Sequence, residues 1–139
     1  MSEVRKERTG WRDKDLSARH RRWGWDAPAI DLDLIFCEYD TGEPKALVEY
    51  KNEHAAKQYA SHPSYQALIS LGTNSKIPVF AVRYADDFSW WTVTSLNDFA
   101  KEYIADRETL SEADYVRLLY RTKGYEAPKE IIDGLNIEL

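Results

Sequence analysis

The chain has 139 residues, 43% of them hydrophobic and 31% charged, and a single domain commonly holds roughly 100–200 residues. No apolar run approaches the roughly 20 residues that span a bilayer, the N-terminus lacks the apolar stretch of a secretory signal, and the lone Cys37 excludes an internal disulfide framework. We therefore expect one cytoplasmic domain with no membrane partner.

The charge is divided unevenly along the chain. The formal net charge is −5, but residues 1–22 contain eight Lys and Arg against four Asp and Glu, so this segment carries +4 and the remainder −9. A basic segment of this kind could contact phosphates while an acidic body binds metal, with Arg19, Arg21 and Arg22 as the candidate nucleic-acid contacts. A solvated charged tail is the alternative. We expect residues 1–12 to be mobile and residues 13–139 to form the domain.

Alternation of apolar residues marks the first predicted hairpin. A short polar helix is expected from about Asp13 to Arg22, and strict alternation over Ile30–Phe36 then predicts a strand. Turn residues at positions 40–42 precede a second strand, Ala46–Lys51. Because the connection is short, the two strands are predicted to pair antiparallel.

The rest of the chain mixes helices and strands. Pro63 suits a first helical turn after a cap at Ser61 or His62, and Ser111 has Asp114 three residues later, a weak capping-box match. The predicted elements are a helix over Pro63–Asn74, strands over Pro78–Tyr84 and Ser89–Thr94, a helix that Ser95 caps and that runs to about Ile104, and a helix after Ser111 that ends before Gly124. The sequence thus predicts a mixed α/β domain with C-terminal helices.

Charged residues share one face of the predicted hairpin. Side chains two apart on a strand point the same way. Asp31 and Asp33 therefore share a face of the first strand, and Glu49 and Lys51 share a face of the second. If the hairpin forms, Asp33 and Glu49 converge. Mg²⁺ is typically held by one or two carboxylates, and a nearby ammonium can orient water and stabilise charge on a phosphodiester. Ordinary cross-strand ion pairs with Lys51 are the alternative.

These residues resemble the signature of the PD-(D/E)xK nuclease superfamily, which has an Asp on one strand, a short hairpin, and Asp/Glu-x-Lys on the next strand. DLIF at Asp33–Phe36 and ALVEYKN at Ala46–Asn52 carry the resemblance, which covers roughly residues 13–94. It implies a restriction-endonuclease-like core, with a mixed central sheet flanked by helices and the C-terminal helices as an addition. It also implies hydrolysis of phosphodiester bonds with Mg²⁺ or Mn²⁺.

The resemblance implies a role for each matching residue. Asp33 and Glu49 are the implied metal ligands, the backbone carbonyl of Tyr50 is a further one, and Lys51 is the implied catalytic lysine. Asp31 is either an outer partner of these ligands or the true ligand under a shifted register.

Positions outside the signature leave alternatives open. Gln66 resembles a glutamine that lies beside the active site in RecB-like branches, or is a partly exposed helix residue, and Tyr65 is a substrate contact or a core residue. His54 could touch a phosphate or be an exposed loop histidine. Many members carry a Glu on the first helix, which residues 13–22 lack, so the number of metal ions stays open.

The leading expectation is a metal-dependent nuclease of phage or mobile-element type with DNA as its partner, in which a homodimer would let two sites address two strands. The alternative is a non-catalytic nucleic-acid- or protein-binding module that keeps the nuclease fold. A third interpretation is an unrelated α/β protein with a chance Glu-x-Lys, which predicts that Asp33 and Glu49 lie apart or point into solvent.

Overall fold

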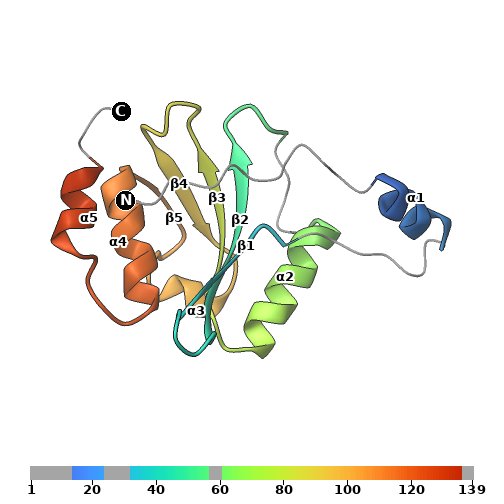
Figure 1. The fold of residues 1–139 in the computed structure, drawn as a ribbon, viewed down its shortest axis with the longest axis horizontal. Helices are drawn as coiled ribbons and strands as arrows, with labels where there is room; N and C mark the ends of the chain where they lie inside the picture. The colour runs from blue at the N-terminus through green and yellow to red at the C-terminus, as the bar shows by residue number, and fades with distance from the viewer. Residues whose placement is uncertain (1–13, 24–31, 57–60, 136–139) are drawn as a thin grey trace. The chain divides into compact units, whose positions relative to one another are not determined.

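The computed structural model describes residues 14–23, 32–56 and 61–135, and these belong to two units, residues 1–30 and residues 31–139 (Figure 1). In the first unit, helix α1 (Lys14–Arg22) confirms the helix expected at about residues 13–22. Asp15 lies in its first turn, and its last turn is basic, a charge order that suits the helix dipole. Among the described residues, no helix combines the length and apolar character needed to cross a membrane.

The second unit is built on a mixed five-stranded sheet with strand order β1-β2-β3-β4-β5. The strands are β1 (Leu34–Cys37), β2 (Pro44–Asn52), β3 (Val79–Tyr84), β4 (Trp91–Ser95) and β5 (Arg107–Leu110). Neighbouring strands pair antiparallel except β2 and β3, which are parallel. A parallel pair needs a crossover connection, and helix α2 (Pro63–Asn74) lies within the one between β2 and β3. The α/β class, the mixed sheet and the β1–β2 hairpin are therefore confirmed.

Helices flank both faces of this sheet (Figure 1). On one face, α2 contributes Tyr65 and Leu68 to a cluster with Leu47 and Val79 of the strands. The other face packs against the short helix α3 (Asp98–Lys101) and against α4 (Glu112–Thr122). The second cluster consists of Ala46, Val48, Phe80, Val82, Val93, Ala100, Ile104, Tyr115 and Leu118. Since β2 buries alternate residues in both clusters, it is the central strand of the core.

Helix ends follow the predicted capping residues in two cases. Helix α2 spans the predicted Pro63–Asn74, and the cap is His62, whose ring nitrogen accepts the Ser64 N–H at 3.2 Å. Helix α4 begins after Ser111, whose hydroxyl accepts the Asp114 N–H at 3.1 Å. Helix α5 (Lys129–Gly134) follows α4.

Strand β1 is shorter than predicted. It begins at Leu34, not Ile30, because the Tyr50 N–H donates to the carboxylate of Asp33 at 2.9 Å, and the strand ladder stops before that residue. Leu32 consequently packs with the cluster of Leu47 and Val79 beneath α2. The predicted strand had placed it on the opposite face, together with Leu34. Residues 30 and 31 lie outside the described residues.

The region after β4 also corrects the prediction. Strand β4 continues through Ser95, whose hydroxyl donates to the carbonyl of Ile104 instead of capping a helix. The cap is Asn97, which accepts the Ala100 N–H at 2.9 Å, and the helix ends at Lys101. Strand β5 was not predicted, because three of its four side chains are polar and exposed and show no apolar alternation.

Gly72 permits the close approach of α2 to the sheet. A Cβ at this position would lie 2.1 Å from Cγ2 of Val79 and 3.3 Å from the carbonyl oxygen of Ile77. Helix propensity favours Ala over Gly by about 1 kcal/mol, whereas overpacking typically costs about 1–3 kcal/mol.

Because the 2.1 Å contact is severe, we expect an overpacking cost near the upper end of that range, so Gly72→Ala should lower the free energy of unfolding in urea denaturation by about 2 kcal/mol after this offset. Gly134→Ala is the matched control in α5, because a Cβ at that position would have no atom within 4 Å, and it should be neutral or slightly stabilising. Equal stability of both variants would show that α2 can move away from β3 at little cost.

Candidate functional site

Asp33 and Glu49 meet at the end of the β1–β2 hairpin. Asp33 directly precedes Leu34, which pairs with Val48, and the charge and a hydrogen bond of the Asp33 side chain both act on the carboxyl of Glu49, so the two side chains lie together. The Asp33 carboxylate is held there by the Tyr50 N–H at 2.9 Å. The structure therefore brings together the two carboxylates on which the sequence prediction depends.

Burial makes the position of Glu49 electrostatically unfavourable. Its side chain is 13% exposed, whereas Asp33 is an exposed residue. Burial is the largest cause that raises the pKa of Glu49 above its usual value of 4.5, and the negative charge of Asp33 is the next. A buried carboxylate next to a second one favours a proton or a cation as its partner.

Lys51 offsets this repulsion only in part. Its Nζ lies 3.8 Å from Oε1 of Glu49, too far for a hydrogen bond, and its charge lowers the Glu49 pKa less than burial and Asp33 raise it. Oε2 of Glu49 is buried and has no hydrogen-bond partner among the described residues. Because buried polar atoms are nearly always partnered, this oxygen is a position that could accept a further partner such as a water, a proton or a cation.

Tyr50 lies between the two charged residues of β2. Its backbone N–H faces Asp33, while its side chain packs with the Val48 cluster on the opposite face of the sheet and its hydroxyl contacts that of Tyr115. Strand alternation thus separates Tyr50 from Glu49 and Lys51, as the sequence predicts.

The other predicted site residues have mixed positions. Gln66 is exposed on α2 and its N–H donates to the carbonyl of His62 at 3.0 Å. Arg19, Arg21 and Arg22 are exposed in the last turn of α1, which belongs to the unit of residues 1–30. Asp31 lies outside the described residues.

The site includes two further residues: the sequence left the role of Tyr65 open and gave no indication of Arg83. Tyr65 is buried, and burial first and the charge of Glu49 second raise the pKa of its phenol, so it is a core residue close to the carboxylates. Arg83 was missed; it pairs in register with Lys51, and only the parallel pairing of β2 and β3 brings the two together.

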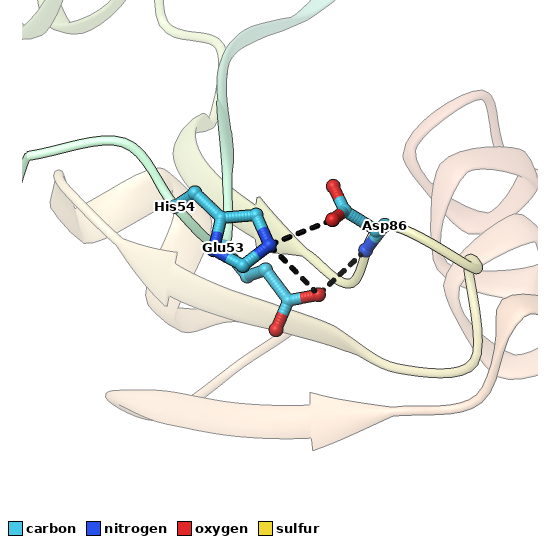
Figure 2. Close-up of side chains that lie close together, drawn as sticks. All are labelled: Glu53, His54 and Asp86. Atoms are coloured by element: carbon cyan, nitrogen blue, oxygen red, sulfur yellow. Dashed lines mark hydrogen bonds and ion pairs between the residues drawn. The ribbon is translucent and has the colours of Figure 1, made fainter.

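A second polar cluster lies beyond the ends of β2 and β3 and consists of Glu53, His54 and Asp86 (Figure 2). Nε2 of His54 is 2.6 Å from Oδ2 of Asp86 and 3.8 Å from Oε1 of Glu53. The Asp86 N–H donates to Oε1 of Glu53 at 2.9 Å. One ligand atom from each residue lies within 4.8 Å of the others, a spacing compatible with a metal ion, but all three residues are exposed and bond to one another.

Hydrogen bonds fix Asp86 and the loop that faces it. The side chain of Asn52 donates to Oδ1 of Asp86 at 2.7 Å, and this bond and the one to His54 lower the pKa of Asp86. Nη1 of Arg83 donates to the carbonyls of Asn52, Glu53 and Ala55 at 3.1, 3.3 and 2.9 Å. The loop after β2 is therefore held by contacts from β3 and its following turn. Sequence reasoning missed Asp86 because it lies 32 residues from His54.

Comparisons of the chain with models of known protein families, with curated proteins and with solved structures found no match.

The raised pKa of Glu49 predicts how the stability of the fold depends on pH. Since the fold disfavours the ionised carboxylate, stability without metal should fall as pH rises through the raised Glu49 pKa and should be greater below it. We expect Glu49→Gln to raise Tm at pH 7 by a few degrees and to flatten this part of the pH profile. Calorimetry between pH 4 and 8 in a chelator measures both.

Glu108→Gln, which removes an exposed carboxylate from β5, is the control and should leave Tm and its pH profile nearly unchanged. A lower Tm for Glu49→Gln would contradict the inference that the ionised form of Glu49 is strained in the fold.

Proposed function

We propose that this chain is a nuclease that hydrolyses phosphodiester bonds in DNA and depends on Mg²⁺ or Mn²⁺. The observation that carries the proposal is the buried Oε2 of Glu49, which has no hydrogen-bond partner in the described part of the chain. Asp33 interacts with this carboxyl group, and Nζ of Lys51 lies 3.8 Å from its other oxygen. The resemblance of Asp33, Glu49 and Lys51 to the PD-(D/E)xK signature adds to it.

The residues present fit a hard divalent cation. Asp33 and Glu49 supply carboxylate oxygens, which such ions prefer, and Oε2 of Glu49 receives no hydrogen bond from any residue that the structure describes. The backbone carbonyl of Tyr50 is the proposed third ligand. When bound, the cation would neutralise charge developing on a phosphodiester and activate water.

The chain's own groups have separate tasks in this proposal. The Tyr50 N–H holds the Asp33 carboxylate in one orientation. Lys51, whose side chain is 29% exposed, can reach a substrate, orient the attacking water and stabilise negative charge on the phosphate oxygens. Gln66 on α2 is proposed as a neighbouring contact.

The arrangement of elements is compatible with a restriction-endonuclease-like core. A hairpin carries the carboxylates, α2 follows it, and β3 then joins β2 in a mixed sheet. Arg19, Arg21 and Arg22 on α1 are proposed to contact DNA phosphates. We also propose a homodimer, in which two sites act on two strands.

Cleavage of labelled single-stranded, duplex and branched DNA with Mg²⁺ or Mn²⁺ tests the proposal. We expect metal-dependent cutting by the wild type and a loss of roughly 100-fold or more in Lys51→Ala, because charge stabilisation in a site is commonly worth this much. Asp33→Asn should abolish cutting and also the rise in Tm that Mn²⁺ produces in the wild type.

Lys45→Ala is the matched control, because Lys45 lies on the same strand, six residues before Lys51, and its Nζ forms an ion pair with Glu43 at 3.2 Å. It should cut as the wild type does. A folded wild type that neither cuts any of these substrates nor gains Tm with Mn²⁺ would favour the non-catalytic binding module.

A further inference from the structure

We propose that His54, oriented by Asp86, is a catalytic residue that donates a proton to the ester oxygen leaving the scissile phosphate. The proposal rests on the proposed nuclease function and deepens it. It starts from a gap in the site: Asp33 and Glu49 are carboxylates, and Lys51 is assigned to the attacking water. None of the three therefore protonates the leaving group.

His54 lies at the same end of the sheet as Lys51. Strand β2 ends at Asn52, and the Ala55 N–H donates to the Asn52 carbonyl at 2.9 Å, so the chain reverses in a tight turn that carries His54 at its tip. Because three residues of fully extended chain span at most about 11 Å, the Cα atoms of Lys51 and His54 lie no further apart than that. Ligands of α/β proteins commonly bind where parallel strands end, and β2 and β3 end together here.

The imidazole of His54 is held in a defined orientation. Asp86 is an ionised acceptor at neutral pH because its pKa is lowered, so the ring nitrogen at 2.6 Å, Nε2, carries the hydrogen of that bond. Nδ1 makes no hydrogen bond with the described residues, and the side chain is 72% exposed. The ring therefore presents Nδ1 to solvent from a fixed position.

The rest of the network makes this orientation rigid. The His54 N–H donates to the side-chain oxygen of Asn52 at 3.0 Å, and the amide nitrogen of the same Asn52 side chain donates to Asp86. Glu53 accepts the Asp86 N–H, and Arg83 binds three carbonyls of the loop. A side chain that acts in a transition state needs such support, whereas a solvated loop histidine does not.

The chemical step balances without a further reagent. Water oxygen bonds to phosphorus and releases one of its protons to bulk solvent, the bond from phosphorus to the leaving ester oxygen breaks, and its electron pair passes to that oxygen. The proton on Nδ1 of the imidazolium moves to the ester oxygen, and the neutral ring, still bonded to Asp86 through Nε2, regains a proton from solvent. Histidine suits this task because its charge changes near neutral pH.

The proton transfer is tested by comparing DNA with a substrate whose leaving group needs no proton. We expect His54→Ala to cleave DNA roughly 100-fold more slowly than the wild type with Mn²⁺, since a general acid typically contributes about 10²–10⁴-fold. Hydrolysis of bis(p-nitrophenyl) phosphate should change by less than about 3-fold, because p-nitrophenolate leaves without protonation. Asp86→Asn should show the same selective loss to a smaller degree, because Asp86 positions the ring.

His62→Asn is the matched control: it removes another exposed histidine but keeps a side chain that can cap α2, and it should cleave both substrates as the wild type does. An equal loss on both substrates in His54→Ala would assign His54 a structural role and overturn the proposal. Wild-type rates on DNA in His54→Ala would overturn it too and leave the nuclease standing. A wild type that cleaves neither substrate contradicts the proposed function itself.

Discussion

The parallel pairing of β2 with β3 is the constraint on which the rest of the structure depends. It requires a crossover, which brings α2 over one face of the sheet, and it makes β2 a central strand with Ala46, Leu47 and Val48 fully buried. It also ends both strands at the same edge. Lys51 therefore has Arg83 beside it, and the loop after β2 meets the turn that contains Asp86.

Glu49 marks the point where this central strand changes from core to site. Two residues earlier, Leu47 on the same face is 2% exposed and packs against α2. A hydrophobic residue at position 49 would extend that packing, yet the chain places a carboxylate there, opposite Asp33 and with one oxygen that has no partner among the described residues. Such local conflicts with the core pattern are expected where function has been favoured over stability.

The parts of the fold that follow local rules could be predicted from the sequence. Pro63 and Ser111 mark helix starts through local steric and hydrogen-bond preferences, and the short turn before Ala46 predicts the hairpin that sets Asp33 against Glu49. Strand β5 could not be predicted, because it is an edge strand of polar residues that is defined by its pairing with β4. Asp86 joins His54 only through the parallel register, which has no local signal.

Rigidity of the site comes from the opposite face of the sheet. The ring of Tyr50 packs edge-on against Tyr84, Trp91 and Tyr115, with centroid distances of 6.1–6.3 Å, and Trp91 stacks on Tyr115 at 4.9 Å. Because this residue is fixed in an aromatic core, the backbone on either side of it is fixed as well. Glu49 and Lys51 therefore project from a strand that is anchored by its opposite face, so a proton on Glu49, or the cation of the proposed function, would relieve the repulsion without a shift of the backbone.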